Sequence, residues 1–317
     1  MQHLRITVPA RLTEPVLAAV ADDPAVTTLT VQRGSALRPL GDVIELDVAR
    51  EATNDVVDAL RRLGVPDHGT VHIAAVPTWL SREALTAEQE APGHSADAVV
   101  WAQVAHQSYA ETELNWSYGS FMVLATLLAG IAIILDSQIL VIGAMVLGPE
   151  FAAIAALGVA LVRRRYQLLR RATVTLLGGF AVAILATTGA TLLGRALGWV
   201  TLRDVTGPRP GTGFIYTPDR WSFIVALIAA AAGVLSLTSA RVGGLSGVFI
   251  SVTTIPAAAN VGMALAFGVR SEVVGSSLQL ALNLVGMAAA GALTLALQQA
   301  VWARVLKRRV RARAKHP

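Results

Sequence analysis

Two patterns of hydrophobic and polar positions divide the chain. Residues 4–76 alternate short β-type runs with helix-type periodicity, whereas residues 119–301 consist of long apolar segments separated by short polar breaks. Apolar residues at every second position predict strands, and apolar residues three and four positions apart predict helices. In the first part these signals follow the order βαββαβ, the split βαβ arrangement of ferredoxin-like domains. We therefore expect a soluble α+β ferredoxin-like domain over residues 1–78.

The stretch between these two parts is polar at first and then mixed. Residues 79–96 are rich in charged and small residues and predict a linker. Residues 97–117 predict a helix that carries Trp101, Tyr109 and Trp116. Because tryptophan and tyrosine are enriched where a membrane meets water, we expect this helix to lie at the membrane interface.

The long apolar segments predict an α-helical polytopic membrane domain over residues 118–302, followed by a basic tail over 303–317. A helix needs about 20 predominantly apolar residues to cross the hydrocarbon core. Six segments qualify, at roughly residues 119–136, 138–162, 171–194, 220–240, 245–268 and 274–301. The composition agrees, since 54% of residues are hydrophobic, only 15% are charged and the mean hydropathy is +0.57. These values exclude a purely soluble protein.

The basic residues predict the orientation of the six segments. Cytoplasmic connections of membrane proteins carry an excess of lysine and arginine. If the N-terminal domain is cytoplasmic, the connections on its side hold 13 basic residues, mainly within 163–171 and 304–315, against five on the other side. We therefore expect a multi-pass protein of the cell inner (plasma) membrane with both termini cytoplasmic. Because the basic clusters adjoin apolar runs, we expect the lipid bilayer and not nucleic acid as a partner.

Two of the six segments contain a proline near their centre, Pro149 and Pro256. Proline removes a backbone donor and clashes with the preceding turn, so each helix is expected to kink or break there. At an offset of 107 residues Pro149 falls on Pro256 and Gly179 falls on Gly286. We therefore predict two three-helix halves in a 3+3 inverted repeat. Interrupted helices in inverted halves are typical of transporters whose sites lie near the bilayer centre.

Glu150 is the only ionisable residue deep within a predicted span. Placing the comparable aspartate at the centre of a membrane helix costs about 2.5–3.5 kcal/mol. One hypothesis is that Glu150 ligates a cation or carries a proton, and the alternative is that it caps backbone amides freed after Pro149. The predicted substrate- or ion-binding residues are Gly148, Pro149, Glu150, Thr253, Thr254, Pro256, Asn260 and Asn283, with Gln279, Thr187 and Thr188 as neighbours.

Several chemistries lack the residues that they need. The chain has no cysteine, which excludes disulfides and thiolate sites. Its only lysines, Lys307 and Lys315, lie in the tail, so a phosphate-binding P-loop is not possible. Since no histidine lies between His106 and His316, the spans cannot contain a serine–histidine pair. We therefore expect neither an enzyme nor a bound cofactor or metal.

Three stretches of the membrane part carry a resemblance to a known family: 141–149, 250–262 and 281–285. They resemble the bacterial membrane family called domain of unknown function 389, an uncharacterised hydrophobic domain. The resemblance covers about residues 117–300 and implies no activity. Glu150 stands where the resemblance leads us to expect an apolar or small residue, so its carboxylate departs from the family pattern.

These patterns together predict a membrane transporter or channel that moves a small solute or ion at the interface of two inverted three-helix repeats. The cytoplasmic domain would regulate it or hold a homo-oligomer together. The alternative is a non-transporting membrane scaffold or sensor. A transporter predicts a polar, water-reachable cavity beside Pro149 and Pro256, whereas a scaffold predicts a dry, alanine-packed centre.

Overall fold

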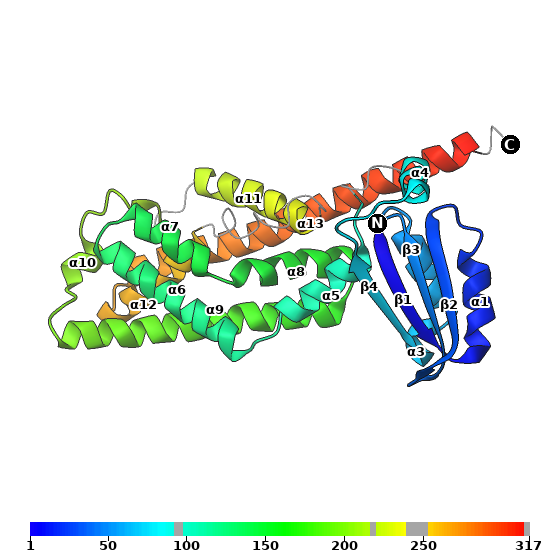
Figure 1. Cartoon of the computed structure of the whole chain (residues 1–317). Coiled ribbons are helices and arrows are strands. Elements are labelled where there is room, and N and C mark those ends of the chain that lie inside the picture. The colour runs from blue at the N-terminus through cyan, green and yellow to red at the C-terminus, as the bar shows by residue number, and fades with distance from the viewer. Residues whose placement is uncertain (92–97, 216–219, 239–252, 314–317) are drawn as a thin grey trace. The chain divides into compact units, whose positions relative to one another are not determined.

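The computed structural model describes residues 1–91, 98–215, 220–238 and 253–313 (Figure 1). The chain divides into two compact units, one centred on Met1–Val104 and the other on Ala105–Leu237 with later residues up to Gln298. The first unit contains a four-stranded sheet. The second unit is helical and contains the candidate membrane spans.

The first unit is an antiparallel sheet with helices. Its elements follow the order β1 (Gln2–Val8), α1 (Ala10–Val20), β2 (Val26–Leu37), β3 (Leu40–Val48), α2 (Thr53–Arg62), α3 (Val65–His68) and β4 (Thr70–Ala75). The strands are arranged in space as β2-β3-β1-β4, and all neighbours are antiparallel. The predicted order of strands and helices is confirmed, with the short helix α3 as an addition.

Alternate residues of β1 build the core of this unit. Leu4, Ile6 and Val8 are buried, whereas Arg5 between them is exposed, because successive side chains of a strand point to opposite faces. Helices α1 and α2 add apolar residues at helical spacing, which cover the same face of the sheet. These helical core residues are Val16, Val20, Val56, Val57 and Leu60.

The stretch predicted to be a linker contains a helix, α4 (Arg82–Glu90). The side chain of Ser81 begins it by accepting a 3.2 Å hydrogen bond from the amide of Ala84. Ala84 and Ala87 are buried, and Ala84 and Ala91 belong to the core of the first unit. Composition alone indicated a linker because the buried residues of this stretch are alanines, which add little hydrophobicity. Alanine nevertheless packs closely against a core.

The rest of the described chain is helical. Its elements are α5 (Trp101–Glu111), α6 (Trp116–Ile134), α7 (Gln138–Leu147), α8 (Glu150–Val162), α9 (Tyr166–Ala196), α10 (Leu202–Thr206), the 3-10 helix η2 (Gly213–Ile215), α11 (Arg220–Thr238), α12 (Thr254–Phe267) and α13 (Arg270–Arg313). The helix predicted over 97–117 ends at Glu111. A new helix starts at Trp116 because the side chain of Asn115 accepts a 2.8 Å hydrogen bond from the amide of Tyr118.

The helical unit contains candidate membrane spans, as a multi-pass protein does. Within the described ranges, three helices are long and apolar enough to cross a membrane, namely α6, α9 and α13 as far as Arg304. The bent pair α7 and α8 makes a fourth if it is one span, and the apolar helices over Phe223–Thr238 and Thr254–Phe267 are shorter. The structure thus has three to four candidate spans where six were predicted. Part of the predicted fifth span, residues 245–252, lies outside the described residues.

Close packing between α12 and α9 depends on a glycine. A Cβ atom added to Gly262 would lie 2.9 Å from Cβ of Thr187 and 3.0 Å from the carbonyl oxygen of Ile184. The hydroxyl of Thr188 donates a 3.0 Å hydrogen bond to the Gly262 carbonyl. Small residues and short polar contacts of this kind are typical of helix pairs in membranes. This packing fixes the position of α12, whose first turn forms part of the candidate site.

Candidate functional site

The second predicted apolar segment is broken at its proline. Helix α7 ends at Leu147, helix α8 begins at Glu150, and the two helices are bent by 55° at Gly148 and Pro149. Pro149 stands directly before α8, where its missing N–H removes no hydrogen bond from the helix. The predicted interruption at this proline is therefore confirmed.

Gly148 makes room for the groups that gather at this break. A Cβ atom on Gly148 would overlap Oε2 of Glu150 and lie 2.7 Å from Cγ1 of Ile255. The carboxyl group of Glu150 therefore folds back over Gly148, and the first turn of α12 lies against the same point. Any larger residue at position 148 would displace one of these two groups.

The fifth predicted segment also has a helix start near its proline. Helix α12 begins at Thr254, with Thr253 directly before it. Pro256 lies in the first turn, where an N–H group has no partner within the helix and its loss is tolerated. The preceding residues 239–252 lie outside the described part of the chain, so the structure gives the start of α12 but not what comes before it.

The starts of α8 and α12 meet. The hydroxyl of Thr254 donates a 2.8 Å hydrogen bond to Oε1 of Glu150. Both side chains are buried, with exposed fractions of 0% for Thr254 and 1% for Glu150. The first turn of a helix presents free N–H groups and a partial positive charge, which stabilise a carboxylate. The position of Glu150 at two helix starts thus gives a physical reason for a buried acid here.

Asn283 of α13 joins this group. Its Nδ2 donates a 2.6 Å hydrogen bond to the hydroxyl of Thr253. Its Oδ1 is buried without a hydrogen-bond partner in the part of the chain that the structure describes, as is the hydroxyl of Thr187 on α9. Buried polar atoms usually have a protein or water partner. Because Thr253 and Thr254 are adjacent in the chain, the two hydrogen bonds join four residues into one buried polar group. We call this group, which consists of Glu150, Thr253, Thr254 and Asn283, the break cluster.

Asn260 belongs to a different cluster. Its Nδ2 donates hydrogen bonds to Oε2 of Glu272 at 2.8 Å and to Oγ of Ser276 at 2.7 Å, and its Oδ1 accepts one from Arg209 at 3.0 Å. Arg209 also forms a 3.3 Å ion pair with Glu272, and their side chains are only 5% and 12% exposed. Asn260 was predicted to bind solute, but its amide is engaged by its own chain. It joins α12 to α13 and to the loop that carries Arg209.

The loop that carries Arg209 is held against the connection between α6 and α7. The amide of Gly211 and the hydroxyl of Thr212 donate to Asp136 at 3.1 and 2.8 Å. Nε2 of Gln138 donates a 3.0 Å hydrogen bond to the carbonyl of Gly211. The Gly211 amide is the main reason why the pKa of Asp136 lies below its usual value. Together with the ion pair of Arg209 and Glu272, these contacts bring the connection after α6, the loop after α10 and the start of α13 to one end of the helical unit.

The remaining predicted neighbours serve helix packing. Thr188 donates to the carbonyls of Ile184 and Gly262, and Gln279 is buried on α13. Sequence reasoning missed the roles of Arg209 and Glu272, because neither residue stands in a motif that indicates its partner. Across the described ranges, no group of three or more histidine or acidic side chains could hold a metal ion.

The centre around the break cluster is closed to solvent. Ala153, Ala257, Ala258 and Ala259 are fully buried beside it. The alanine packing predicted for a scaffold is therefore present. The same centre also holds a carboxyl group, two hydroxyls and an amide, which packing alone does not require.

Comparisons with known proteins agree with the resemblance seen in the sequence. A model of the family described as "Domain of unknown function (DUF389)" matches residues 145–289. This range contains every residue of the break cluster as well as Asn260. Comparison with curated proteins and with solved structures gives no match.

Proposed function

We propose that this protein, whose residues 145–289 match the DUF389 family model, is a membrane transporter or channel for a small solute or ion. Its site would be the break cluster, where α8 and α12 begin. The observation that carries this proposal is the buried hydrogen bond from Thr254 to Glu150, which joins the first residues of two helices. In many transporters the starts of interrupted helices point at the substrate near the bilayer midplane.

Two aromatic–glycine contacts support the six-span inverted repeat. A Cβ atom on Gly179 of α9 would lie 2.6 Å from the ring of Tyr118 of α6. A Cβ atom on Gly286 of α13 would lie 2.6 Å from the ring of Phe223 of α11. In each proposed half, the third helix therefore has a glycine against which an aromatic side chain of the first helix packs. The two glycines are also the pair that matches at the offset of 107 residues.

The helix starts favour one role for Glu150. Their partial positive charge stabilises an anion and opposes a cation. A metal cation bound to Glu150 would lie in this positive potential, which disfavours it. We therefore assign Glu150 the exchange of a proton and not the ligation of a metal cation. In the proposed mechanism, protonation of Glu150 removes the resident negative charge and allows a solute to enter between α8 and α12. The closed centre then corresponds to an occluded state.

The first unit has the strand order of a ferredoxin-like domain. We assign it to the cytoplasm as a regulatory or homo-oligomer contact domain. A hollow of about 630 Å³ on its sheet, lined by His3, Arg5 and His72 among others, supports a contact surface there. Because the chain has no cysteine, R164C and R203C test the orientation: in intact cells an impermeant maleimide should label R203C only. Labelling of R164C under the same conditions would contradict this orientation.

A non-transporting scaffold or sensor is the second candidate. The closed, alanine-packed centre favours it, and in that case Glu150 only caps two helices. The two candidates differ in what they predict for solute movement, because a scaffold supports no flux in any state.

Flux through liposomes tests the proposal. The full-length protein would be reconstituted and assayed with a panel of ions and metabolites at several pH values, alongside E150Q and the control E111Q. Glu111 lies on α5, outside the break cluster. We expect a solute whose flux and pH dependence are lost in E150Q and kept in E111Q. Flux that is equal in wild type and E150Q at every pH would refute the assigned site, and no flux for any solute would favour the scaffold.

A further inference from the structure

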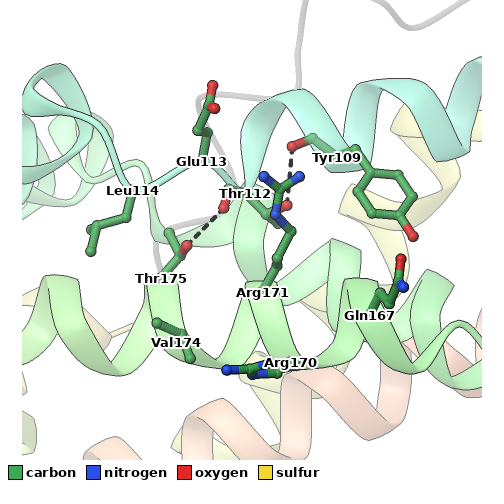
Figure 2. A pocket seen from close by; sticks show the side chains of 9 residues that line it. All are labelled: Tyr109, Thr112, Glu113, Leu114, Gln167, Arg170, Arg171, Val174 and Thr175. Atoms are coloured by element: carbon green, nitrogen blue, oxygen red, sulfur yellow. Dashed lines mark hydrogen bonds between the residues drawn. The ribbon is translucent and has the colours of Figure 1, made fainter.

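A second site lies at the start of α9, apart from the break cluster. It is a pocket of about 610 Å³ between the end of α5, the connection to α6 and the first turns of α9 (Figure 2). The lining residues that matter here are Tyr109, Leu114, Gln167, Arg170, Arg171 and Val174. Figure 2 shows Arg171 projecting from α9 toward the end of α5, with Leu114 on one side and Tyr109 and Gln167 on the other.

Buried threonines hold the two walls of this pocket together. The hydroxyl of Thr175 on α9 donates a 2.7 Å hydrogen bond to the carbonyl of Thr112, which follows α5. The hydroxyl of Thr112 donates a 2.8 Å hydrogen bond to the carbonyl of Ser108. Because Thr112 and Thr175 are both buried, these bonds are shielded from water, and the pocket keeps its shape without a ligand.

The polar part of the pocket is suited to an anion. Arg170 and Arg171 are exposed, and neither forms an ion pair with a carboxylate in the described ranges. Glu113 is the one acidic residue that lines the pocket, so two positive charges face a single negative charge. Guanidinium groups match pairs of phosphate oxygens, and the Tyr109 hydroxyl and the Gln167 amide add donors.

The apolar part of the pocket is suited to an acyl chain. Leu114 and Val174 are 51% and 56% exposed, and Leu177, one turn beyond Val174 on α9, is exposed as well. Trp116 at the start of α6 is also exposed, and tryptophan is enriched at the membrane interface. Cationic and apolar surfaces thus lie side by side where a candidate span begins, which is where a phospholipid has its phosphate and the first carbons of its chains.

We propose that this pocket binds the phosphate group of an anionic phospholipid. Arg170 and Arg171 would hold the phosphate, and Leu114 and Val174 would contact an acyl chain. Basic pockets beside membrane helices on the cytoplasmic side bind such head groups, and residues 163–171 belong to the connection predicted to be cytoplasmic. The proposal depends on membrane association of the helical unit and is independent of transport through the break cluster.

Lipid counting on the full-length protein tests this site. Native mass spectrometry of the detergent-solubilised protein would follow the binding of dioleoylphosphatidylglycerol and of dioleoylphosphatidylcholine to wild type, R170Q/R171Q and the control R164Q/R165Q. The control removes two arginines from the same connection, but neither residue lines the pocket. We expect phosphatidylglycerol to bind R170Q/R171Q about 10- to 30-fold more weakly than the control. Equal affinity in the two variants, or no preference of wild type for phosphatidylglycerol, would overturn the proposal.

A second pair of measurements identifies the source of the phosphate. The variant L114Q/V174Q changes only exposed side chains, so its fold is expected to persist. If the ligand is a lipid, this variant binds phosphatidylglycerol more weakly than wild type, and inorganic phosphate does not displace the lipid. If inorganic phosphate binds wild type and L114Q/V174Q equally and displaces phosphatidylglycerol, the site takes free phosphate and the lipid assignment is wrong.

Discussion

Thr254 donates a 2.8 Å hydrogen bond to Glu150 across 104 positions of sequence. Each residue begins a helix, so the bond links two helix starts through one buried carboxyl group. Hydrogen bonds to charged groups contribute about 1.5–3 kcal/mol to stability. We predict that T254V lowers the free energy of unfolding by about this amount, measured by chemical denaturation in detergent. T254S keeps the hydroxyl and should retain most of the stability; equal losses in both variants would show that packing, and not the hydrogen bond, is responsible.

The ion pair of Arg209 and Glu272 is buried and shared with Asn260. Removal of one member of a buried pair costs about 3–5 kcal/mol, because the other charge is left without its partner. We predict that R209Q destabilises the helical unit by roughly this amount and that R209Q/E272Q destabilises it less than R209Q alone. Thermal unfolding of the three proteins in detergent gives the comparison. A double variant that loses as much stability as R209Q alone, or more, would contradict direct pairing.

Gly262 sets the distance between α12 and α9. An alanine there would bring Cβ to 3.0 Å from the carbonyl oxygen of Ile184, which is backbone and cannot move alone. We predict that G262A destabilises the protein by about 1–3 kcal/mol. The control is G189A on α9, where an added Cβ meets nothing within 4 Å. A neutral G262A, or an equal effect of G189A, in the same thermal unfolding assay would contradict this packing.

Asp42 makes the first unit sensitive to acid. The Thr13 hydroxyl donates to Oδ2 at 2.6 Å and the Gly34 amide to Oδ1 at 2.8 Å, and both bonds hold the pKa of Asp42 below its usual value. A lowered folded-state pKa means that the stabilisation is present above the unfolded value of about 3.9 and is lost as pH falls through the folded value.

The variant T13V tests this linkage. We predict faster hydrogen exchange than in wild type in α1 and β3 at neutral pH, because the carboxylate has lost its main donor. The difference should shrink when the pH falls well below about 3.9, since Asp42 is then protonated in both proteins. Hydrogen exchange corrected for intrinsic rates measures both conditions, and a difference that does not change with pH would exclude Asp42 as the cause.

Local sequence patterns predicted the features that depend on local physics. The alternation of Leu4, Ile6 and Val8 indicated a half-buried strand, and Pro149 indicated a broken helix; both are present in the structure. The helix α4 was missed because its buried residues are alanines in a polar stretch. The pairing of Arg209 with Glu272 was missed because it arises only when distant connections fold to the same end of the helical unit.

For the same reason, the residues predicted to form one site lie in two separate clusters. Glu150, Thr253, Thr254 and Asn283 meet because two helix starts and α13 converge. Asn260 lies further along α12, where Glu272, Ser276 and Arg209 engage its side chain. The position of a residue along a predicted helix does not determine its neighbours, because these depend on the packing of the whole unit.

The proposal that solute passes through the break cluster is tested most directly by pH-dependent flux of wild type and E150Q in proteoliposomes, with E111Q as the control. We predict that wild type and E111Q transport the same solute with the same pH profile and that E150Q loses the flux or its response to pH. If E150Q transports that solute with an unchanged rate and pH profile, the carboxyl group at the two helix starts has no part in transport and the proposed site is wrong.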